Sequence, residues 1–177
     1  MPLPRGLRRE CEAILATLPI PNPFTVDRFA QALSETRGRE IVFEPMEAAV
    51  GPNVPSAMWI ALKSVDVVLY ETKTSLAHQT LIKLHELGHI AAGHQCRIQP
   101  EALEAAFPGL DPETVKEHLL LTRAGYDNRE EQQAETLALL LADHLGAPDG
   151  TSPQGRRLTT TLTHPVRRIL AWKQETD

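Results

Sequence analysis

Residues 75–94 have the sequence SLAHQTLIKLHELGHIAAGH. Apolar residues recur in this stretch at spacings of three and four, with polar residues between them. That period matches the 3.6 residues of a helical turn and predicts an α-helix from Ser75 to about Ala92. Gly88 and Gly93 leave room for a neighbouring backbone to approach the helix closely.

The predicted helix contains His85-Glu-Leu-Gly-His89, two histidines four residues apart with a glutamate after the first. Residues at this spacing differ by about 40° in direction and about 6 Å in rise, so both imidazoles can bind one ion. Glu86 lies about 100° round the helix from His85, where it can take a proton from a water on the metal. The pattern predicts a zinc hydrolase with His85 and His89 as ligands and Glu86 as catalytic base.

A catalytic zinc ion usually has three protein ligands, so a third must be found. An extended form of the pattern would need Gly at 92 and His at 95, but the chain has Ala92 and Gln95. His94 is about 140° off the direction of His89 and would reach the same ion only if the helix broke at Gly93. We therefore expect His94 to be a polar residue at the helix end.

The better source of a third ligand is Glu130-Glu-Gln-Gln-Ala-Glu135, in a helix predicted from Asn128 to Leu145. Glu130 and Glu131 flank the apolar stripe of this helix at similar angles, so periodicity leaves both open. Glu135 lies one turn after Glu131 and can accept an N–H from a zinc-bound imidazole, which favours Glu131 as the ligand. The alternative for the whole cluster is a solvated acidic first turn that suits the helix dipole.

Two stretches of the chain resemble the ImmA/IrrE family of metallopeptidases. They are HELGHIAAGH at residues 85–94 and EQQAETLALLL at residues 131–141, and the similarity covers roughly residues 25–145. The sequence departs from the family in having Glu135 where Asn or Asp is usual. The connection over residues 95–127 is also long for the family.

The resemblance implies a zincin-like fold with one zinc ion per chain, held by His85, His89 and Glu131. It further implies an intracellular endopeptidase that cleaves a regulatory protein, such as a helix-turn-helix repressor or an antitoxin-like partner. One competing hypothesis is a zincin-like module that controls a partner by binding without hydrolysis, but a structural site would have no need of Glu86. Another is a zinc hydrolase that acts on a small-molecule amide.

The pattern outside these helices predicts an α+β fold, with a small antiparallel sheet packed on a helical body. Strands are expected at Glu40–Phe43, Met58–Lys63 and Val65–Tyr70, with a tight turn near Ser64 between the last two. Further helices are expected over residues 7–18, from Val26 to Gly38 with Thr25 as N-cap, over 113–121 and over 166–173.

Length and composition limit the number of domains and the kinds of partner that the chain can have. A chain of 177 residues with 42% apolar content is enough for one core, which predicts a single domain over residues 1–177 with a C-terminal loop and helix at 146–177. The net charge of -5, with scattered Lys and Arg, argues against nucleic acid as a ligand.

Two cysteines are too few for a disulfide framework and favour the cytoplasm. No apolar run is longer than Leu137–Ala142, which is far short of the roughly 20 residues that cross a membrane. Arg5, Arg8 and Arg9 resemble the start of a secretory signal, but acidic residues interrupt the apolar segment that should follow them.

Two more side chains are candidates for the substrate cleft. His78 is seven residues before His85, on nearly the same face of the helix but about 10 Å away by rise, so it can line a cleft but not share the ion. A solvated helix face is the alternative. Tyr126, just before the ligand helix, is a candidate donor to an oxyanion. Trp59 and Tyr70 lie on predicted strands and are expected to pack in the core or at an edge.

Overall fold

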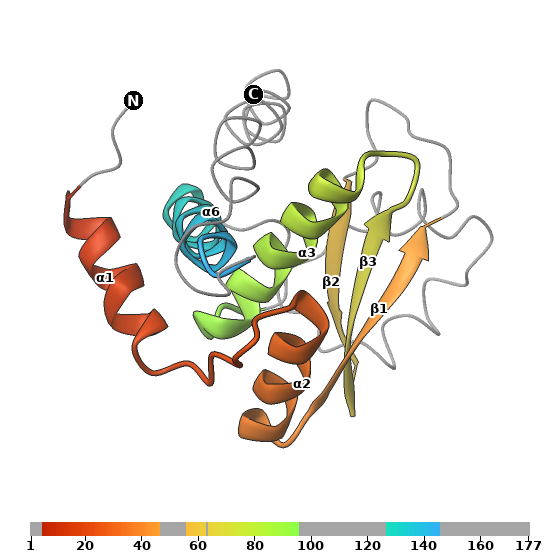
Figure 1. Cartoon of the computed structure of the whole chain (residues 1–177), viewed down its shortest axis with the longest axis horizontal. Coiled ribbons are helices and arrows are strands. Elements are labelled where there is room, and N and C mark those ends of the chain that lie inside the picture. Colours follow the sequence, from red (N-terminus) through yellow and green to blue (C-terminus); the bar gives the residue numbers. More distant parts are fainter. Residues whose placement is uncertain (1–4, 47–55, 63, 96–126, 146–177) are drawn as a thin grey trace.

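The computed structural model of the protein describes residues 5–46, 56–62, 64–95 and 127–145 (Figure 1). The described elements follow the chain in the order α1 (Arg5–Leu15), α2 (Val26–Arg37), β1 (Glu40–Met46), β2 (Ala57–Ala61), β3 (Val65–Glu71), α3 (Leu76–Ala91) and α6 (Asn128–Ala142). These elements confirm the α+β class. The helices predicted at 113–121 and 166–173, the C-terminal loop and Tyr126 all lie outside the described residues.

The sheet differs from the antiparallel one that the sequence predicted. Its strand order is β1-β3-β2, with β1 parallel to β3 and β2 antiparallel to β3. The expectation assumed that strands adjacent in sequence would be neighbours in space. Instead β3, whose Val68 and Leu69 are buried, takes the centre of the sheet, and β1 pairs with it rather than with β2. β2 and β3 run antiparallel as neighbours in the chain, and β1, on the other side of β3, runs in the same direction as β3.

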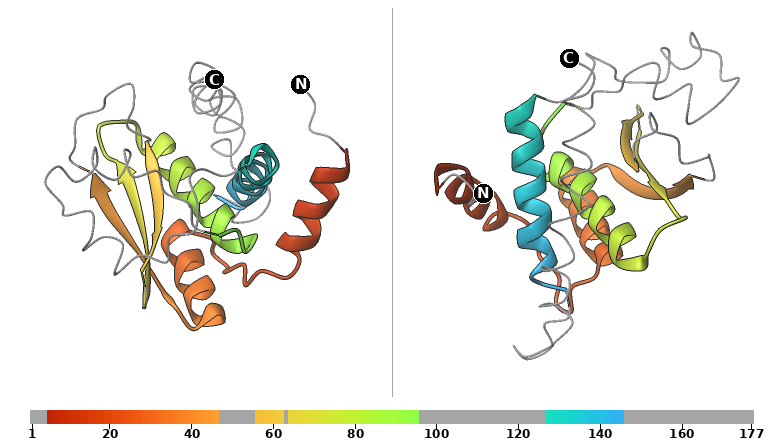
Figure 2. Two further views of the ribbon diagram at one scale, coloured as in Figure 1. Left: turned by 180° about the vertical axis from the view of Figure 1, so that it is seen from behind. Right: turned by 90° about the horizontal axis from the view of Figure 1, so that it is seen from above.

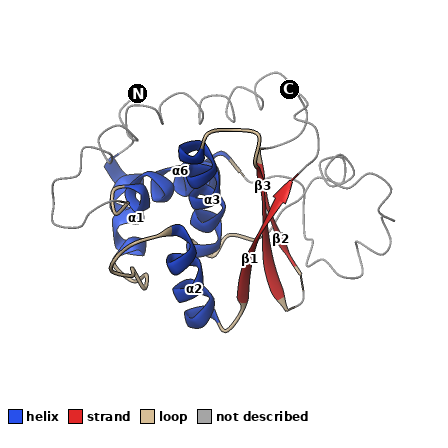
Figure 3. Cartoon of the chain, turned by 45° about the vertical axis from the view of Figure 1, so that its right-hand side comes forward, coloured by secondary structure: helices blue, strands red, loops and turns tan. Residues whose placement is uncertain are grey.

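The four described helices α1, α2, α3 and α6 lie on one side of the sheet (Figure 3). α3 packs between the sheet and α6, and α1 lies on the far side of α6 (Figure 2). α2 contacts both β1 and α3. The central place of α3 explains why its residues are apolar on most sides, since it meets the sheet on one face and α6 on another.

Local capping determines where the helices begin and end. Thr25 accepts a hydrogen bond from the Arg28 N–H at the start of α2, and Gly38 closes that helix with a φ of 63°, as the sequence predicted. Ser75 caps α3 in the same way. Asp127 caps α6 in a reciprocal capping box with Glu130.

Buried side chains form one main cluster and one smaller cluster among the described residues. The main cluster contains residues from Phe24, just before α2, to Ala142 at the end of α6. It includes residues of both helices and strands. The smaller one joins Leu7 and Cys11 of α1 to Leu137 of α6, so α1 is the amphipathic helix that its spacing predicted. No described helix is both long enough and apolar enough to cross a membrane.

Candidate metal centre

The centre lies where α3 and α6 cross at very short range. A Cβ placed on Gly88 would stand 2.8 Å from the carbonyl oxygen of Ala134 and 3.2 Å from its Cα, so only glycine fits there. Gly88 is in the middle of the His85–His89 stretch, and Ala134 is less than one turn after Glu131 on α6. The close crossing predicted for Gly88 therefore brings Glu131 to the two histidines.

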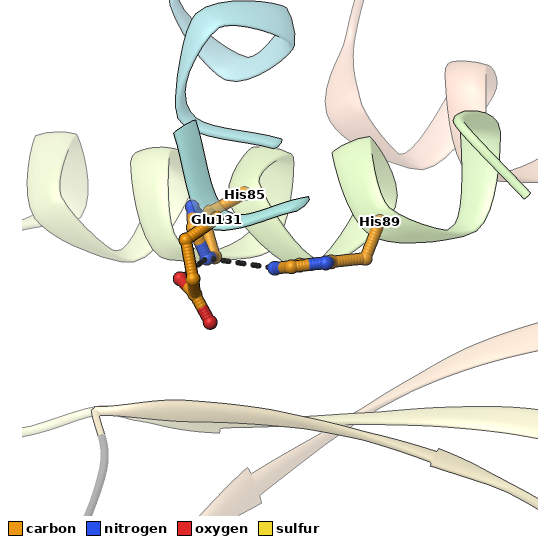
Figure 4. Close-up of side chains that lie close together, drawn as sticks. All are labelled: His85, His89 and Glu131. Atoms are coloured by element: carbon orange, nitrogen blue, oxygen red, sulfur yellow. Dashed lines mark hydrogen bonds and ion pairs between the residues drawn. The ribbon is translucent and has the colours of Figure 1, made fainter. Parts of the chain in front are cut away.

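Three side chains converge at this crossing (Figure 4). His85 Nε2 lies 3.1 Å from His89 Nε2 and 3.5 Å from Glu131 Oε2. Two ligand atoms that each lie about 2.1 Å from zinc at a tetrahedral angle are about 3.4 Å apart. The three potential ligand atoms all lie within 4.8 Å of one another, so His85, His89 and Glu131 could hold a metal ion.

Glu86 is buried beside this group and is not part of it. Its side chain is 6% exposed, and the backbone of Trp59 on β2 donates a hydrogen bond to it. Burial raises the pKa of Glu86 to about 7; the charge of Glu131 adds to the rise, while His85 and the Trp59 hydrogen bond oppose it. The carboxyl group thus faces β2, on the sheet side of α3.

The position of Trp59 is fixed by a buried polar network. Its indole Nε1 donates to Asp66 Oδ1 over 3.0 Å. Asp66 is fully buried and forms ion pairs with Arg37 at 3.2 Å and Arg39 at 2.9 Å, so its charge is compensated. The network joins α2, β2 and β3. It holds the segment of β2 whose backbone meets Glu86.

The centre carries an excess of negative charge. Burial alone would lower the pKa of His85, but the hydrogen bond to Glu131 and the charges of Glu86, Glu131 and Glu135 outweigh burial, and the net shift is upward. The pKa of Glu135 is also raised, by burial first and by Glu131, with His85 opposing. Several carboxyl groups around one buried and one partly buried imidazole make a site whose electrostatics favour a bound cation.

Glu130 and Glu131, which periodicity could not distinguish as the third ligand, have different partners in the structure. Glu131 joins the histidines, whereas Glu130 accepts a hydrogen bond from the Asp127 N–H in the capping box of α6. Glu135 is close enough to act on the charge of His85, but its role as the acceptor of an imidazole N–H stays a prediction. His78 lies in the first turn of α3, outside the three-residue group, and Tyr126 lies outside the described residues.

Two further residues lie next to the centre: His94, which follows the end of α3 as the sequence predicted but contacts His89 unexpectedly, and Gln133, which the sequence analysis did not single out. His94 Nδ1 lies 2.9 Å from His89 Nδ1, and His94 Nε2 lies 2.8 Å from Gln133 Oε1. The sequence did contain a signal for His94. A glycine at position 93 can end α3 in a left-handed turn, which folds the next residue back over the last turn of the helix.

Comparison with known proteins found no match to this chain among protein-family models, curated proteins or solved structures.

Proposed function

We propose that this chain is an intracellular zinc-dependent endopeptidase, similar to the ImmA/IrrE metallopeptidases. The observation that carries the proposal is the convergence of His85, His89 and Glu131 at the α3–α6 crossing, with Glu86 buried beside them. Two imidazoles and one carboxylate are the ligands of many catalytic zinc sites, in which one coordination position is left for water.

The donor set fits zinc better than the harder divalent cations. Calcium and magnesium prefer shells made only of oxygen ligands, whereas imidazole nitrogen suits zinc and its transition-metal neighbours. The spacing of the three ligand atoms also suits a tetrahedral shell. When bound, zinc would supply Lewis-acid chemistry and lower the pKa of water in the site.

Glu86 is the proposed proton acceptor and donor of the reaction. It is on the same turn of α3 as His85, yet it points to β2 rather than into the ligand group. That position leaves its carboxylate available to take a proton from water and to return it to a leaving amine. A purely structural metal site would gain nothing from a buried carboxylate that coordinates nothing.

The proposed substrate is a regulatory protein in the cytoplasm, such as a helix-turn-helix repressor or an antitoxin-like partner. Support for this comes from the resemblance of residues 85–94 and 131–141 to ImmA/IrrE members, and from the net charge of -5, which disfavours nucleic acid as the ligand.

The proposal is tested first by metal analysis and then by cleavage. Protein purified without added metal should contain one zinc ion per chain. Co-expression with a helix-turn-helix regulator encoded beside it should give limited cleavage of that regulator. Glu86→Gln should abolish cleavage and keep both zinc and partner binding, because the side chain lies outside the ligand group.

Three results would count against the proposed endopeptidase. A folded wild-type protein that takes up no zinc after reconstitution would remove the basis of the proposal. Zinc-loaded protein that binds the regulator without cleaving it would favour the alternative of a binding module. Cleavage that persists in Glu86→Gln would indicate a contaminating protease.

A further inference from the structure

A chain of hydrogen bonds leads from His89 to α6. His89 Nδ1 lies 2.9 Å from His94 Nδ1, and the opposite nitrogen of His94, Nε2, lies 2.8 Å from Gln133 Oε1. His89 is fully buried, while His94 and Gln133 are half-buried. This series of hydrogen bonds reaches His89 at Nδ1. The other ring nitrogen of His89, Nε2, lies near His85 Nε2.

The backbone after α3 is built to bring His94 back to His89. Gly93 has a φ of 71°, a left-handed conformation that glycine adopts without strain. The Gly93 N–H donates to Ile90 O at 3.2 Å, and the His94 N–H donates to His89 O at 3.0 Å. These two bonds form a Schellman motif, which reverses the chain over the last turn of the helix.

The donors and acceptors along this chain fix the proton on each ring. The Gln133 carbonyl oxygen can only accept, so a neutral His94 donates from Nε2 and keeps a lone pair on Nδ1. That lone pair accepts the Nδ1–H of His89, which leaves the lone pair of His89 on Nε2. His89 Nε2 is the atom near His85 and Glu131. With the Gln133 amide reversed, His89 Nε2 would carry a proton and could not bind a metal.

We infer that His94 and Gln133 are positioning residues that hold the imidazole of His89 with its proton on Nδ1 and its Nε2 lone pair directed at the metal centre. The inference rests on the proposed metal site. It adds a second link between α3 and α6, since Gln133 is two residues after Glu131. The helix that supplies the third ligand thus also orients one of the other two.

Variants at the two positions separate orientation from general stability. His94→Leu and Gln133→Leu should weaken zinc binding, measured by competition with a chromogenic chelator, by about 10- to 100-fold, the usual effect of losing an outer hydrogen-bond partner. His94→Asn should keep most of the affinity, because its Oδ1 can stand near the position of the His94 Nδ1 lone pair.

Gln132→Leu is the matched control. Gln132 is next to Gln133 on α6, but its amide donates to Asn128 Oδ1 at 3.3 Å on the exposed side of the helix. Its zinc affinity should equal that of the wild type. Equal affinity in His94→Leu and wild type, or equal loss in Gln132→Leu and Gln133→Leu, would overturn the inference.

The ring protons can be observed directly without metal. A long-range ¹H–¹⁵N NMR spectrum of the metal-free wild-type protein should show His89 with its proton on Nδ1, and His94→Leu should lose that preference. A proton on Nε2 of His89 in the wild type would overturn the inference. Because this measurement needs no metal, it tests the hydrogen bonds from His89 through His94 to Gln133 separately from the proposed zinc site.

Discussion

At the scale of single residues, Glu130 and Glu131 have different tasks although they are adjacent in sequence. Glu130 completes the capping box at the first turn of α6, and Glu131 points across the helix crossing to His85. Successive residues of a helix differ by about 100° in direction, so one carboxylate can face the start of its own helix while the next faces α3.

Glu131→Gln and Glu130→Gln should therefore have unequal effects on zinc affinity. Glu131→Gln removes a ligand charge, and we expect a loss greater than the about 100-fold upper range for an outer partner. Glu130→Gln should leave the affinity near that of the wild type, since glutamine also serves in a capping box. Isothermal titration or chelator competition measures both. A larger loss at Glu130 would mean that the ligand helix is rotated from the position described above.

Local sequence could predict that His85 and His89 lie together with Glu86 beside them, because these relative positions depend only on helical geometry. Glu131 was favoured by Glu135 one turn on, although periodicity alone left Glu130 equal to it. The contact of His94 with His89 was not predicted, since the helix pattern by itself places His94 on another face. It depends on the left-handed conformation of Gly93, which sequence permits but does not require.

At the scale of elements, the crossing of α3 and α6 sets the distance between the two histidines on α3 and Glu131 on α6, the proposed ligands. Gly88→Ala should push the helices apart, because the added Cβ would stand 2.8 Å from a backbone oxygen that cannot rotate away. We expect a lower melting temperature and weaker zinc binding together, as Glu131 moves with α6. Gly6→Ala on α1 is the control, since a Cβ there meets nothing within 4 Å. Wild-type zinc affinity in Gly88→Ala would contradict this role of the crossing.

The packing of α1 on α6 can be followed through Cys11. Its side chain is fully buried, and burial, with a smaller contribution from Glu10, raises the pKa of the thiol from 9.0 to about 11. Between these two values the unfolded chain loses the proton that the native state keeps, so the contribution of Cys11 to stability falls as pH rises above about 9.

In a Cys96→Ser variant, Cys11 is the sole thiol of the chain. It should react with a thiol reagent at pH 8 only as fast as α1 detaches, and rapidly in denaturant. Immediate reaction in the native protein would show that α1 does not stay packed on α6.

The order of the strands is the main feature of the fold that sequence did not predict. Alternation and turn residues located all three strands to within a few residues, and the β2–β3 hairpin agrees with the tight turn predicted near Ser64. The partner of β1 is decided by which strand takes the middle of the sheet. That choice is a property of the assembled sheet and not of any one segment, since β2 at the edge is buried along even more of its length than β3 at the centre.

At the scale of the whole molecule, a bound metal should stabilise the fold because its ligands come from two helices. Zinc at about 100 times its dissociation constant would add about 2.7 kcal/mol to the free energy of unfolding. For a chain of this size that corresponds to a rise of roughly 5–10 °C in melting temperature. Calorimetry with EDTA and with added zinc measures the difference. His85→Ala should show no such response, and an equal rise in that variant would place the zinc elsewhere.

The division of the ligands between α3 and α6 also has a consequence for synthesis. A growing chain leaves the ribosome from its N-terminus, so α3 emerges before α6. Until α6 has emerged and docked on Gly88, the nascent chain offers two imidazoles and no carboxylate from Glu131. The complete ligand group exists only once both helices have been translated and packed together. A metal-dependent activity at this centre, if the proposed function holds, would be absent from unfinished or truncated chains that lack α6.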